Sequence, residues 1–250
     1  MRLSRFGLRE ARGYAPPRLA FLTRQPFAHR GLHGAQAVEN SRAAFRAAIG
    51  EGHGIELDVQ AAGDGTPFVF HDATLDRLTH AQGPLALLSP ATLRQVRLRG
   101  TDETLQTLAQ TLTFIAGRVP LLIELKATER REALCEGVLR ALNQYRGEAA
   151  VMSFDPRIVG WFADNAPFLV RGLVVTQGRR SGLRGWLQRR WALWKAAPEF
   201  LAYDVRDLPA REATAARERG LPILTWTVRS VEDHLRAARF ADQPIYERLA

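Results

Sequence analysis

Short apolar runs alternate with amphipathic stretches along most of the chain, a pattern typical of parallel α/β folds. The apolar runs that predict strands are residues 27–31, 55–59, 68–72, 122–126, 150–153, 172–176, 201–204, 223–227 and 241–246. The stretches that predict helices are residues 41–49, 93–98, 105–117 and 134–142. The sequence therefore predicts alternating strands and helices, with no internal repeat and no second domain.

The connection between the second and third predicted strands departs from this alternation. Only residues 61–66 separate the two runs, and Gly63-Asp64-Gly65 within them is a turn signal. A helical crossover between parallel strands needs about a dozen residues or more. We therefore expect an irregular fold in which the helix between the second and third strands is missing.

Length and composition fit one globular domain, because the chain has 250 residues of which 46% are hydrophobic. We expect residues 1–25, which contain Pro16-Pro17, to form an irregular N-terminal arm that is either packed on the bottom of the domain or partly loose, and residues 26–250 to form a single domain. No apolar stretch approaches the ~18 residues of a membrane span. The single Cys135 excludes an intramolecular disulfide framework, so the cytoplasm is the expected location.

The net charge of +9 does not change this picture. Almost all basic residues are arginine and they are scattered rather than striped, so we expect no nucleic-acid partner. Against this background Lys126 stands out, since Lys195 is the only other lysine. A lysine two residues from Glu124 suggests a position that needs a compact point charge.

Two predicted strands carry charged side chains where apolar ones are expected. Because side chains alternate between the faces of a strand, Glu56 shares a face with Asp58, and Glu124 shares one with Lys126. Buried charges persist when they are paired or hold a metal, and three carboxylates suit a hard cation such as Mg²⁺ or Ca²⁺. These residues alone leave open a metal site and an ion-pair network inside the fold.

Two other predicted strands each carry a histidine near their end, His29 and His71. A single histidine at a strand end is more often structural than catalytic. Two histidines beside a carboxylate cluster, however, could form a general acid and base, because imidazole titrates near neutral pH. The sequence therefore favours a catalytic site over an ion-pair network.

Several short motifs follow one another in a recognisable order. They are His29-Arg30-Gly31, Glu39-Asn40-Ser41, Glu56-Leu57-Asp58-Val59, His71-Asp72, Glu124-Leu125-Lys126, Ser153-Phe154 and Thr225-Trp226-Thr227-Val228. In this order they resemble the glycerophosphodiester phosphodiesterase family, from about Phe27 to near the C-terminus. The resemblance implies a (β/α)₈ TIM barrel, a divalent metal, and hydrolysis of glycerophosphodiesters to glycerol 3-phosphate and an alcohol. Ser41 stands where threonine is usual, and one of the predicted strands must lie outside the ring or be wrongly assigned.

The resemblance and the residue chemistry together define a candidate site. The expected metal ligands are Glu56, Asp58 and Glu124, the expected phosphate-binding residues are Arg30 and Lys126, and the expected acid/base pair is His29 and His71. We favour His71 as the acid. The nucleophile is either a water or the substrate's own glycerol hydroxyl.

Three more residues have alternative roles. Glu39 could reach the metal or orient a histidine, and together with Asn40 it could instead cap the following helix. Trp226 could contact the glycerol part of a substrate or pack in the core. The remaining histidines, interpreted as structural or surface residues, are His33, His53, His80 and His234. Asp204 and Asp207 lie at a strand end without a family counterpart.

Residues 183–195 form the second informative segment. Its apolar members at helical spacing are Leu183, Trp186, Leu187, Trp191 and Trp194, flanked by Arg184, Arg189 and Lys195. Such a helix is typical of a membrane interface, or of an outer barrel helix that packs its tryptophan face on the sheet. The segment leaves open a membrane-associated lysophospholipase D-type enzyme of the same fold, peripheral at the inner membrane face.

A third function, non-catalytic phosphate or metal binding, would need broken motifs. The preferred alcohol, the native metal and the oligomeric state are not defined by the sequence.

Overall fold

The computed structural model describes residues 17–178 and 182–248. Its strands are β1 (Phe27–Ala28), β2 (Gly54–Ala61), β3 (Pro67–Val69), β4 (Leu121–Leu125), β5 (Ala149–Ser153), β6 (Val170–Val175), β7 (Phe200–Asp204), β8 (Ile223–Val228) and β9 (Gln243–Tyr246). Its α-helices are α1 (Phe21–Arg24), α2 (Arg42–Gly50), α3 (Pro90–Leu93), α4 (Leu108–Ile115), α5 (Arg131–Leu142), α6 (Pro156–Asn165), α7 (Gly182–Ala196), α8 (Arg211–Glu218) and α9 (Val231–Phe240). Short 3₁₀ helices span Pro17–Leu19, Leu85–Leu87 and Val205–Asp207.

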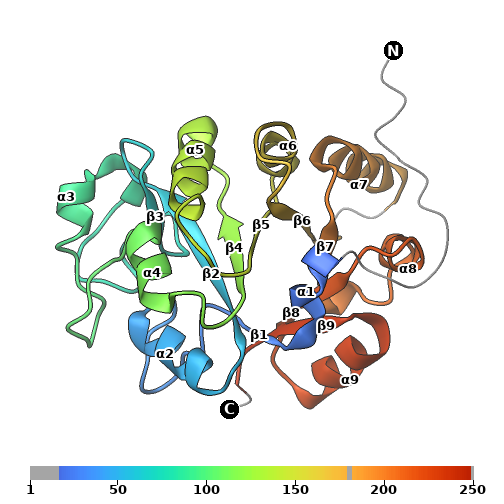
Figure 1. Ribbon diagram of the computed structural model, residues 1–250, viewed down its shortest axis with the longest axis horizontal. Helices are drawn as coiled ribbons and strands as arrows, with labels where there is room; N and C mark the ends of the chain where they lie inside the picture. The colour runs from blue at the N-terminus through green and yellow to red at the C-terminus, as the bar shows by residue number, and fades with distance from the viewer. Residues whose placement is uncertain (1–16, 179–181, 249–250) are drawn as a thin grey trace.

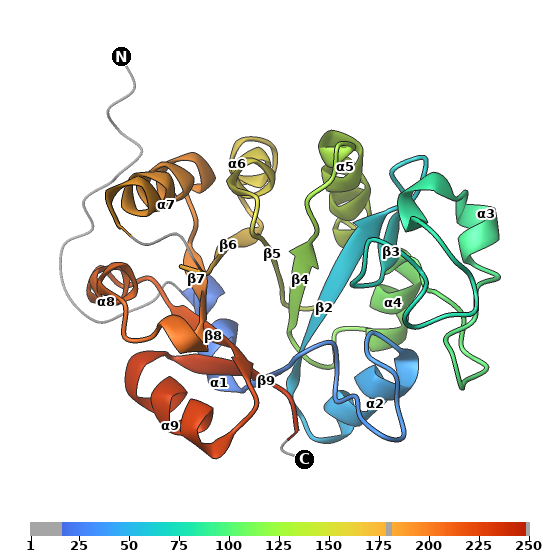
Figure 2. The same cartoon turned by 180° about the vertical axis from the view of Figure 1, so that it is seen from behind.

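All strands except β3 run parallel and close into a ring of eight. The order around the ring is β1, β9, β8, β7, β6, β5, β4, β2, and β1 pairs with β2 to close it. Figures 1 and 2 show the helices around the outside of this ring. The predicted TIM barrel is therefore confirmed, including its last strand.

The irregularity predicted after the second strand is also confirmed. β3 turns back antiparallel to β2 through a tight turn in which Gly65 has φ +89° and Asp64 accepts from the backbone N–H of Thr66. An antiparallel return needs no crossover helix, which explains the short connection. The strand predicted at residues 68–72 is thus the extra one outside the ring, and α3 and α4 lie on the path from β3 to β4.

Alternate side chains of the strands point to opposite sides of the barrel wall, as strand geometry requires. On β4, Leu121, Ile123 and Leu125 pack in the core between barrel and helices, where they meet the outward face of β2. Leu122 lies on the other face, in the cluster that fills the barrel interior. Glu124 shares that inward face, which places its carboxylate above the interior packing and toward the end of the strand.

The chain before β1 is more ordered than expected. Residues 17–25 contain a 3₁₀ helix and α1, whose Leu19, Phe21 and Leu22 are buried in the interior cluster. They pack near Phe200 at the beginning of β7, so they close the barrel at the end where strands start. This packing agrees with the alternative in which the arm covers the barrel bottom, although the segment is helical here rather than irregular. Residues 1–16 of the expected arm lie outside the described residues.

Of two predicted helices outside the ring, one is confirmed and the other is mostly wrong. α2 begins after Ser41, whose hydroxyl accepts from the backbone N–H of Ala44, as the predicted helix at 41–49 requires. The predicted helical patch at 93–98 is wrong beyond α3, because the chain leaves the helix after Leu93. Val96 and Leu98 instead pack in the small core around β3.

Candidate active site

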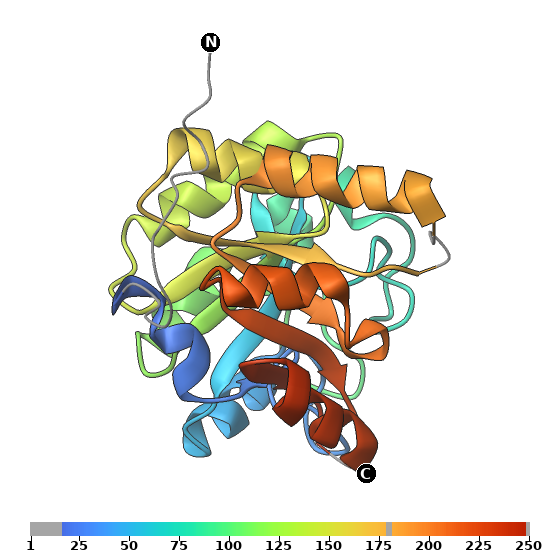
Figure 3. The ribbon, with the colours of Figure 1, turned by 90° about the vertical axis from the view of Figure 1, so that its right-hand side faces the viewer.

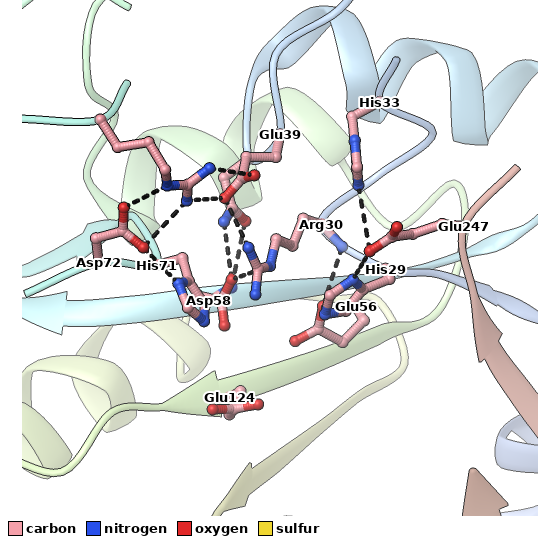
Figure 4. Close-up of polar contacts among 12 residues, drawn as sticks. His29, Arg30, His33, Glu39, Glu56, Asp58, His71, Asp72, Glu124 and Glu247 are labelled. Atoms are coloured by element: carbon pink, nitrogen blue, oxygen red, sulfur yellow. Dashed lines mark hydrogen bonds and ion pairs between the residues drawn. The ribbon is translucent and has the colours of Figure 1, made fainter. Parts of the chain in front are cut away.

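Three carboxylates converge where β2 and β4 lie side by side. Asp58 is the register partner of Glu124, and Glu56 precedes Asp58 by two residues on the same face. All three side chains are buried, and each offers a carboxylate oxygen within 4.8 Å of the others. Figure 4 shows them opening toward the same space. The structure thus brings together the three predicted metal ligands.

The charge balance of this carboxylate triad differs from residue to residue. Burial, together with Asp58 and Glu124, raises the pKa of Glu56 well above its usual value. Burial likewise raises the pKa of Glu124. Burial also acts to raise the pKa of Asp58, but Lys126 and Arg30 outweigh it and lower that pKa to about 2. The positive neighbours thus outweigh burial at Asp58, whereas burial dominates at Glu56 and Glu124.

Lys126 lies between two members of the triad. Its ammonium is 2.6 Å from Asp58 Oδ1 and also pairs with Glu124. Burial acts to lower the pKa of Lys126, yet the two carboxylates raise it to about 12, so the side chain stays charged. The compact charge inferred from its rarity in the sequence does occupy a confined, partly buried position.

Arg30 is fixed on the other side of the triad. Its backbone N–H donates to Glu56 Oε2 at 3.0 Å, its Nη1 donates to Glu39 at 2.8 Å, and its Nε lies 3.1 Å from Asp58 Oδ2. The residue has φ +56°, an unusual backbone conformation for a side chain with a Cβ. In this conformation the backbone N–H of Arg30 contacts Glu56, while the guanidinium contacts Glu39 and Asp58.

His29 is held by a carboxylate that the sequence interpretation did not single out. Its Nδ1 lies 2.7 Å from Glu247 Oε1, while its Nε2 lies 4.0 Å from Glu56 Oε2. Arg229 clamps Glu247 through two hydrogen bonds, of 2.7 and 2.6 Å. Burial acts to raise the pKa of Glu247, but His29, His33 and Arg229 hold it well below its usual range. The carboxylate is thus an acceptor, so the proton on the His29 ring is placed on Nδ1.

His71 has the same kind of support. The antiparallel β3 carries the chain back along β2, and the backbone N–H of Phe70 donates to the carbonyl of Asp58. His71 Nδ1 lies 2.7 Å from Asp72, and Arg77 donates to both carboxylate oxygens of Asp72. Each predicted catalytic histidine therefore has a carboxylate on Nδ1 with an arginine behind it, which leaves Nε2 for chemistry.

Glu39 and Asn40 face the site rather than the helix that follows. Asn40 donates from Nδ2 to Asp58 Oδ2 at 2.9 Å. Glu39 accepts hydrogen bonds from both Arg30 and Arg77. It therefore links the arginine that contacts the triad with the arginine that supports His71 through Asp72. The capping interpretation was wrong, since Ser41 itself caps α2. Glu39 is also absent from the group of mutually close carboxylates, so it supports the site through arginines.

Trp226 takes part in packing. Its indole Nε1 donates to the carbonyl of Ala202 at 2.9 Å, and the side chain packs against the barrel interior. Its ring also meets that of Phe154 edge to face, with centroids 5.2 Å apart. Phe154 remains partly exposed, so the pair lies at the boundary between the interior and the open face of the barrel.

Some side chains near the site were missed or given the wrong surroundings. Glu247, Arg229 and Arg77 were not predicted, although Arg229 and Glu247 directly follow β8 and β9. His33 was interpreted as a structural or surface residue, but its Nε2 lies 3.8 Å from Glu247 Oε1. A carboxylate directly after the last predicted strand was the available signal for Glu247, since the carboxyl ends of parallel strands meet.

Other candidates lie apart from this constellation. Asp204 and Asp207 both accept hydrogen bonds from Thr176, near the ends of β6 and β7, and within the described residues neither carboxylate contacts the triad or the two supported histidines. His53 contacts the hydroxyl of Tyr246 at 2.6 Å, and His80 is exposed. None of these adds a group to the site.

The predicted tryptophan helix is α7. Leu187, Trp191 and Trp194 are 53%, 51% and 59% exposed, so the interpretation that this face packs on the sheet is wrong for these three. α7 instead packs through Ala192, Leu193 and Ala196. The side chains of Leu183, Arg184 and Trp186 lie outside the described residues. Within the described chain no helix combines the length and the apolar character needed to cross a membrane.

Comparisons with known proteins agree with this arrangement. The model of the glycerophosphoryl diester phosphodiesterase family matches residues 29–245. Glycerophosphodiester phosphodiesterase 1 of Rattus norvegicus is 31% identical over 144 residues, which are 53% of this chain and 43% of the relative's length. The chain thus spans less than half the length of that relative. A glycerophosphodiester phosphodiesterase of Caldanaerobacter subterraneus is 27% identical over 82% of this chain and 86% of its own.

Solved structures show the same fold. A phosphodiesterase of Oleispira antarctica, in complex with the product sn-glycerol-3-phosphate, superposes with a TM-score of 0.78 at 24% identity, covering 90% of this chain and 93% of the other. A glycerophosphodiester phosphodiesterase of Thermotoga maritima gives 0.71 at 22% identity, covering 89% and 94%. The match of the family model begins at His29 and ends within β9, so it contains the whole carboxylate triad and both supported histidines. The chain belongs to the glycerophosphoryl diester phosphodiesterase family.

Proposed function

We propose that this protein hydrolyses glycerophosphodiesters to glycerol 3-phosphate and an alcohol, with a divalent metal bound by Glu56, Asp58 and Glu124. The observation that carries the proposal is the convergence of this buried triad with His29 and His71 at one end of the barrel. Membership of the family supports the same reaction.

The donor set fits a hard divalent cation. Three carboxylate oxygens lie close enough to share one ion, and oxygen ligands are those that Mg²⁺ and Ca²⁺ prefer. Burial and the neighbouring carboxylates of Asp58 and Glu124 raise the pKa of Glu56, and a bound cation would oppose both effects. When bound, such a metal polarises a phosphoryl oxygen and neutralises charge that develops at phosphorus.

The chain supplies two further cations for the phosphate. Lys126 stays protonated and Arg30 presents a planar fork of donors, both at the edge of the triad. Each already pairs with carboxylates of the site, so a substrate phosphate would share these donors. Their role would be to hold the diester in place and to stabilise its charge.

The surroundings of the histidines suggest how they divide the proton transfers. Burial lowers the pKa of His29, which favours a neutral ring with a free Nε2 that can accept a proton. We therefore assign His29 as the base toward the attacking oxygen and His71 as the acid toward the leaving alkoxide. The base acts on either a water or the substrate's glycerol hydroxyl.

A substrate panel tests the proposal. Glycerophosphocholine, glycerophosphoethanolamine and glycerophosphoinositol would be incubated with the protein and Mg²⁺ or Ca²⁺, and phosphorus NMR would follow the products. We expect glycerol 3-phosphate, and a transient cyclic phosphate only if the glycerol hydroxyl attacks. Binding of metal and phosphate without turnover of any diester would instead identify a non-catalytic binding protein.

A further inference from the structure

His71 belongs to a part of the chain that the barrel ring does not hold. It lies in residues 70–107, between β3 and α4, which we call the β3–α4 segment. Figure 3 shows this segment, drawn mostly in teal, near the end of the barrel toward which the strand arrows point. The side chain of Gln60 on β2 donates to the backbone carbonyl of His71 at 2.8 Å, which fixes the main chain but not the ring. The direction of the ring therefore depends on neighbouring side chains.

Arg77, in the same segment, holds the partner of that ring. Its Nε donates to Asp72 Oδ2 at 2.6 Å, and its Nη2 donates to Asp72 Oδ1 at 3.0 Å. The same guanidinium donates from Nη1 and Nη2 to the two oxygens of Glu39, at 2.9 and 2.7 Å. A guanidinium can make both contacts at once because its donors form a rigid, planar fork. Arg77 thus fixes Asp72 and Glu39 relative to each other.

Glu39 connects this arrangement with the carboxylate triad. It accepts a hydrogen bond from Arg30 at 2.8 Å, and Arg30 Nε lies 3.1 Å from Asp58 Oδ2. Glu39 and Arg30 both come from the connection between β1 and α2, which is distant in sequence from the β3–α4 segment. Figure 4 shows these contacts as dashed lines between the two sides of the site. A line of hydrogen bonds and ion pairs therefore ties His71 to the triad.

The charges along this line favour ionised carboxylates on both sides of Arg77. The hydrogen bonds from Arg77 hold the pKa of Asp72 below its usual value, although burial acts to raise it. Burial also acts to raise the pKa of Glu39, but Arg77 and Arg30 together lower it. Without Arg77 the two carboxylates would repel each other, and Asp72 would lose the group that holds it against the ring of His71.

The backbone around Arg77 has anchors of its own. Leu75 is fully buried in the small core of the β3–α4 segment. Thr79 is buried as well, and its hydroxyl donates to the carbonyl of Leu75 at 2.9 Å. Arg99 in turn donates to the carbonyl of Thr79 at 2.7 Å. Arg77, whose side chain is 48% exposed, therefore reaches the site from a fixed backbone.

We propose that Arg77 is a positioning residue that holds His71 for proton transfer to the leaving alkoxide. Its loss should then impair mainly substrates whose leaving group needs a proton. This inference rests on the proposed function and on its assignment of His71 as the acid. In the reaction, the attacking oxygen bonds to phosphorus and gives its proton to His29. The bond from phosphorus to the choline oxygen breaks, and that oxygen takes the proton from His71 Nε2, while Asp72 keeps the proton on Nδ1 in place.

Two diesters with different leaving groups test this role. Choline leaves as a strongly basic alkoxide unless it is protonated, whereas 4-nitrophenolate leaves as a stable anion. Released choline and nitrophenolate would give kcat for glycerophosphocholine and for the 4-nitrophenyl ester of glycerol 3-phosphate, with metal present. Arg77→Gln should lower kcat on glycerophosphocholine by about 10–100-fold, since a misplacement of about 1 Å can cost about 10²-fold. The loss on the nitrophenyl ester should be much smaller, and equal losses on the two diesters in a folded variant would overturn the inference.

Matched variants show whether the comparison reports the position of His71. Arg229→Gln acts on the other side of the site, because Arg229 supports His29 through Glu247. Both diesters need the base, so both should lose activity alike. Arg97→Gln removes an exposed ion pair with Asp102 in the β3–α4 segment and should affect neither diester. A selective loss on glycerophosphocholine in either variant would mean that the effect is not specific to Arg77, which would overturn the inference.

Arg77→Lys covers the case in which Arg77→Gln does not fold. The ammonium keeps the charge but has no planar fork for two carboxylates, so the selective loss should be smaller and still present. An equal loss on both diesters in Arg77→Lys would again overturn the inference.

The proposed function fails in a different way. His71→Ala should show the same selective loss as Arg77→Gln, and an equal loss on both diesters would contradict the assignment of His71 as the acid. Absence of turnover of either diester by the wild-type protein would reject the proposed function, and this inference with it.

Discussion

The ring of His29 and the carboxylate of Glu247 meet at 2.7 Å, across the closure of the barrel between its first strand and the residue after its last. This contact fixes the proton of the imidazole on Nδ1 and directs Nε2 toward the triad. It makes the C-terminal end of the chain part of the catalytic apparatus that we propose.

Glu247→Gln should lower kcat by about 10–100-fold and change KM by less than about twofold, because the ring loses a charged orienting partner while the phosphate contacts remain. Glu247→Asp should recover part of the loss. Steady-state kinetics on glycerophosphocholine would measure both. Glu199→Gln is the control, since Glu199 is also clamped by an arginine, Arg171, but lies at the start of β7. An equal loss in the control would show that only stability had changed.

Removal of the metal should abolish turnover. EDTA treatment followed by gel filtration should leave an inactive protein that Mg²⁺ or Ca²⁺ reactivates, because three converging carboxylates offer oxygen ligands that suit one hard cation. Saturating metal at about 100 times Kd should add about 2.7 kcal/mol to the free energy of unfolding. Full activity in protein verified as metal-free would contradict the proposed site.

Glu124→Gln separates a metal ligand from a structural ion pair. The amide keeps the size of the carboxylate, so the fold should persist while calorimetry shows weaker binding of Mg²⁺ or Ca²⁺. An unfolded variant would favour an ion-pair network with Lys126 as the role of Glu124.

His29→Ala and His71→Ala should each reduce kcat by about 10²–10⁴-fold, the usual worth of a positioned acid or base. The double variant should lose far less than the product of the two effects, because residues that act as a unit are not additive. His80→Ala is a suitable control because that side chain is exposed. His33→Ala is unsuitable, since His33 faces Glu247.

Lys126→Arg should reduce kcat/KM although it keeps the charge, because the buried space between Asp58 and Glu124 fits an ammonium better than a planar guanidinium. Lys126→Met should be at least as harmful to turnover and could raise the melting temperature by removing a buried charge. Both would be assayed and melted with metal present. Wild-type kinetics in Lys126→Arg would mean that any cation serves at this position.

Cys135 gives a prediction for alkaline pH. Burial raises the pKa of this thiol from 9.0 to about 12. The neutral thiol is thus favoured in the folded protein, so its contribution to stability is complete below pH 9.0 and is lost as the pH rises toward 12. Iodoacetamide labelling should be negligible in the folded protein and rapid in urea. Fast labelling without denaturant near pH 9.0 would show that the thiol is accessible.

The triad and the two histidines could be predicted because strand alternation and strand ends place their side chains in one region. Arg77 could not, since it reaches the site through loop geometry that sequence spacing does not encode, whereas the position of Glu247 directly after the last strand was a signal that was not used. The ordered turn of α1 was missed for a related reason. Its apolar side chains have no periodic pattern of their own and are stabilised by the barrel end that they cover.

Because β3 lies outside the ring, closure of the barrel does not fix the length of the chain between β2 and β4. The segment between β2 and β4 has a small core of its own, which includes Phe68, Phe70 and Leu85. Its first part, after β3, places His71 at the site. Insertions beyond Asp72 could therefore lengthen it without shifting a single ring hydrogen bond. In evolution, such a segment offers a place where access to a fixed catalytic centre can be redesigned while the barrel itself stays unchanged.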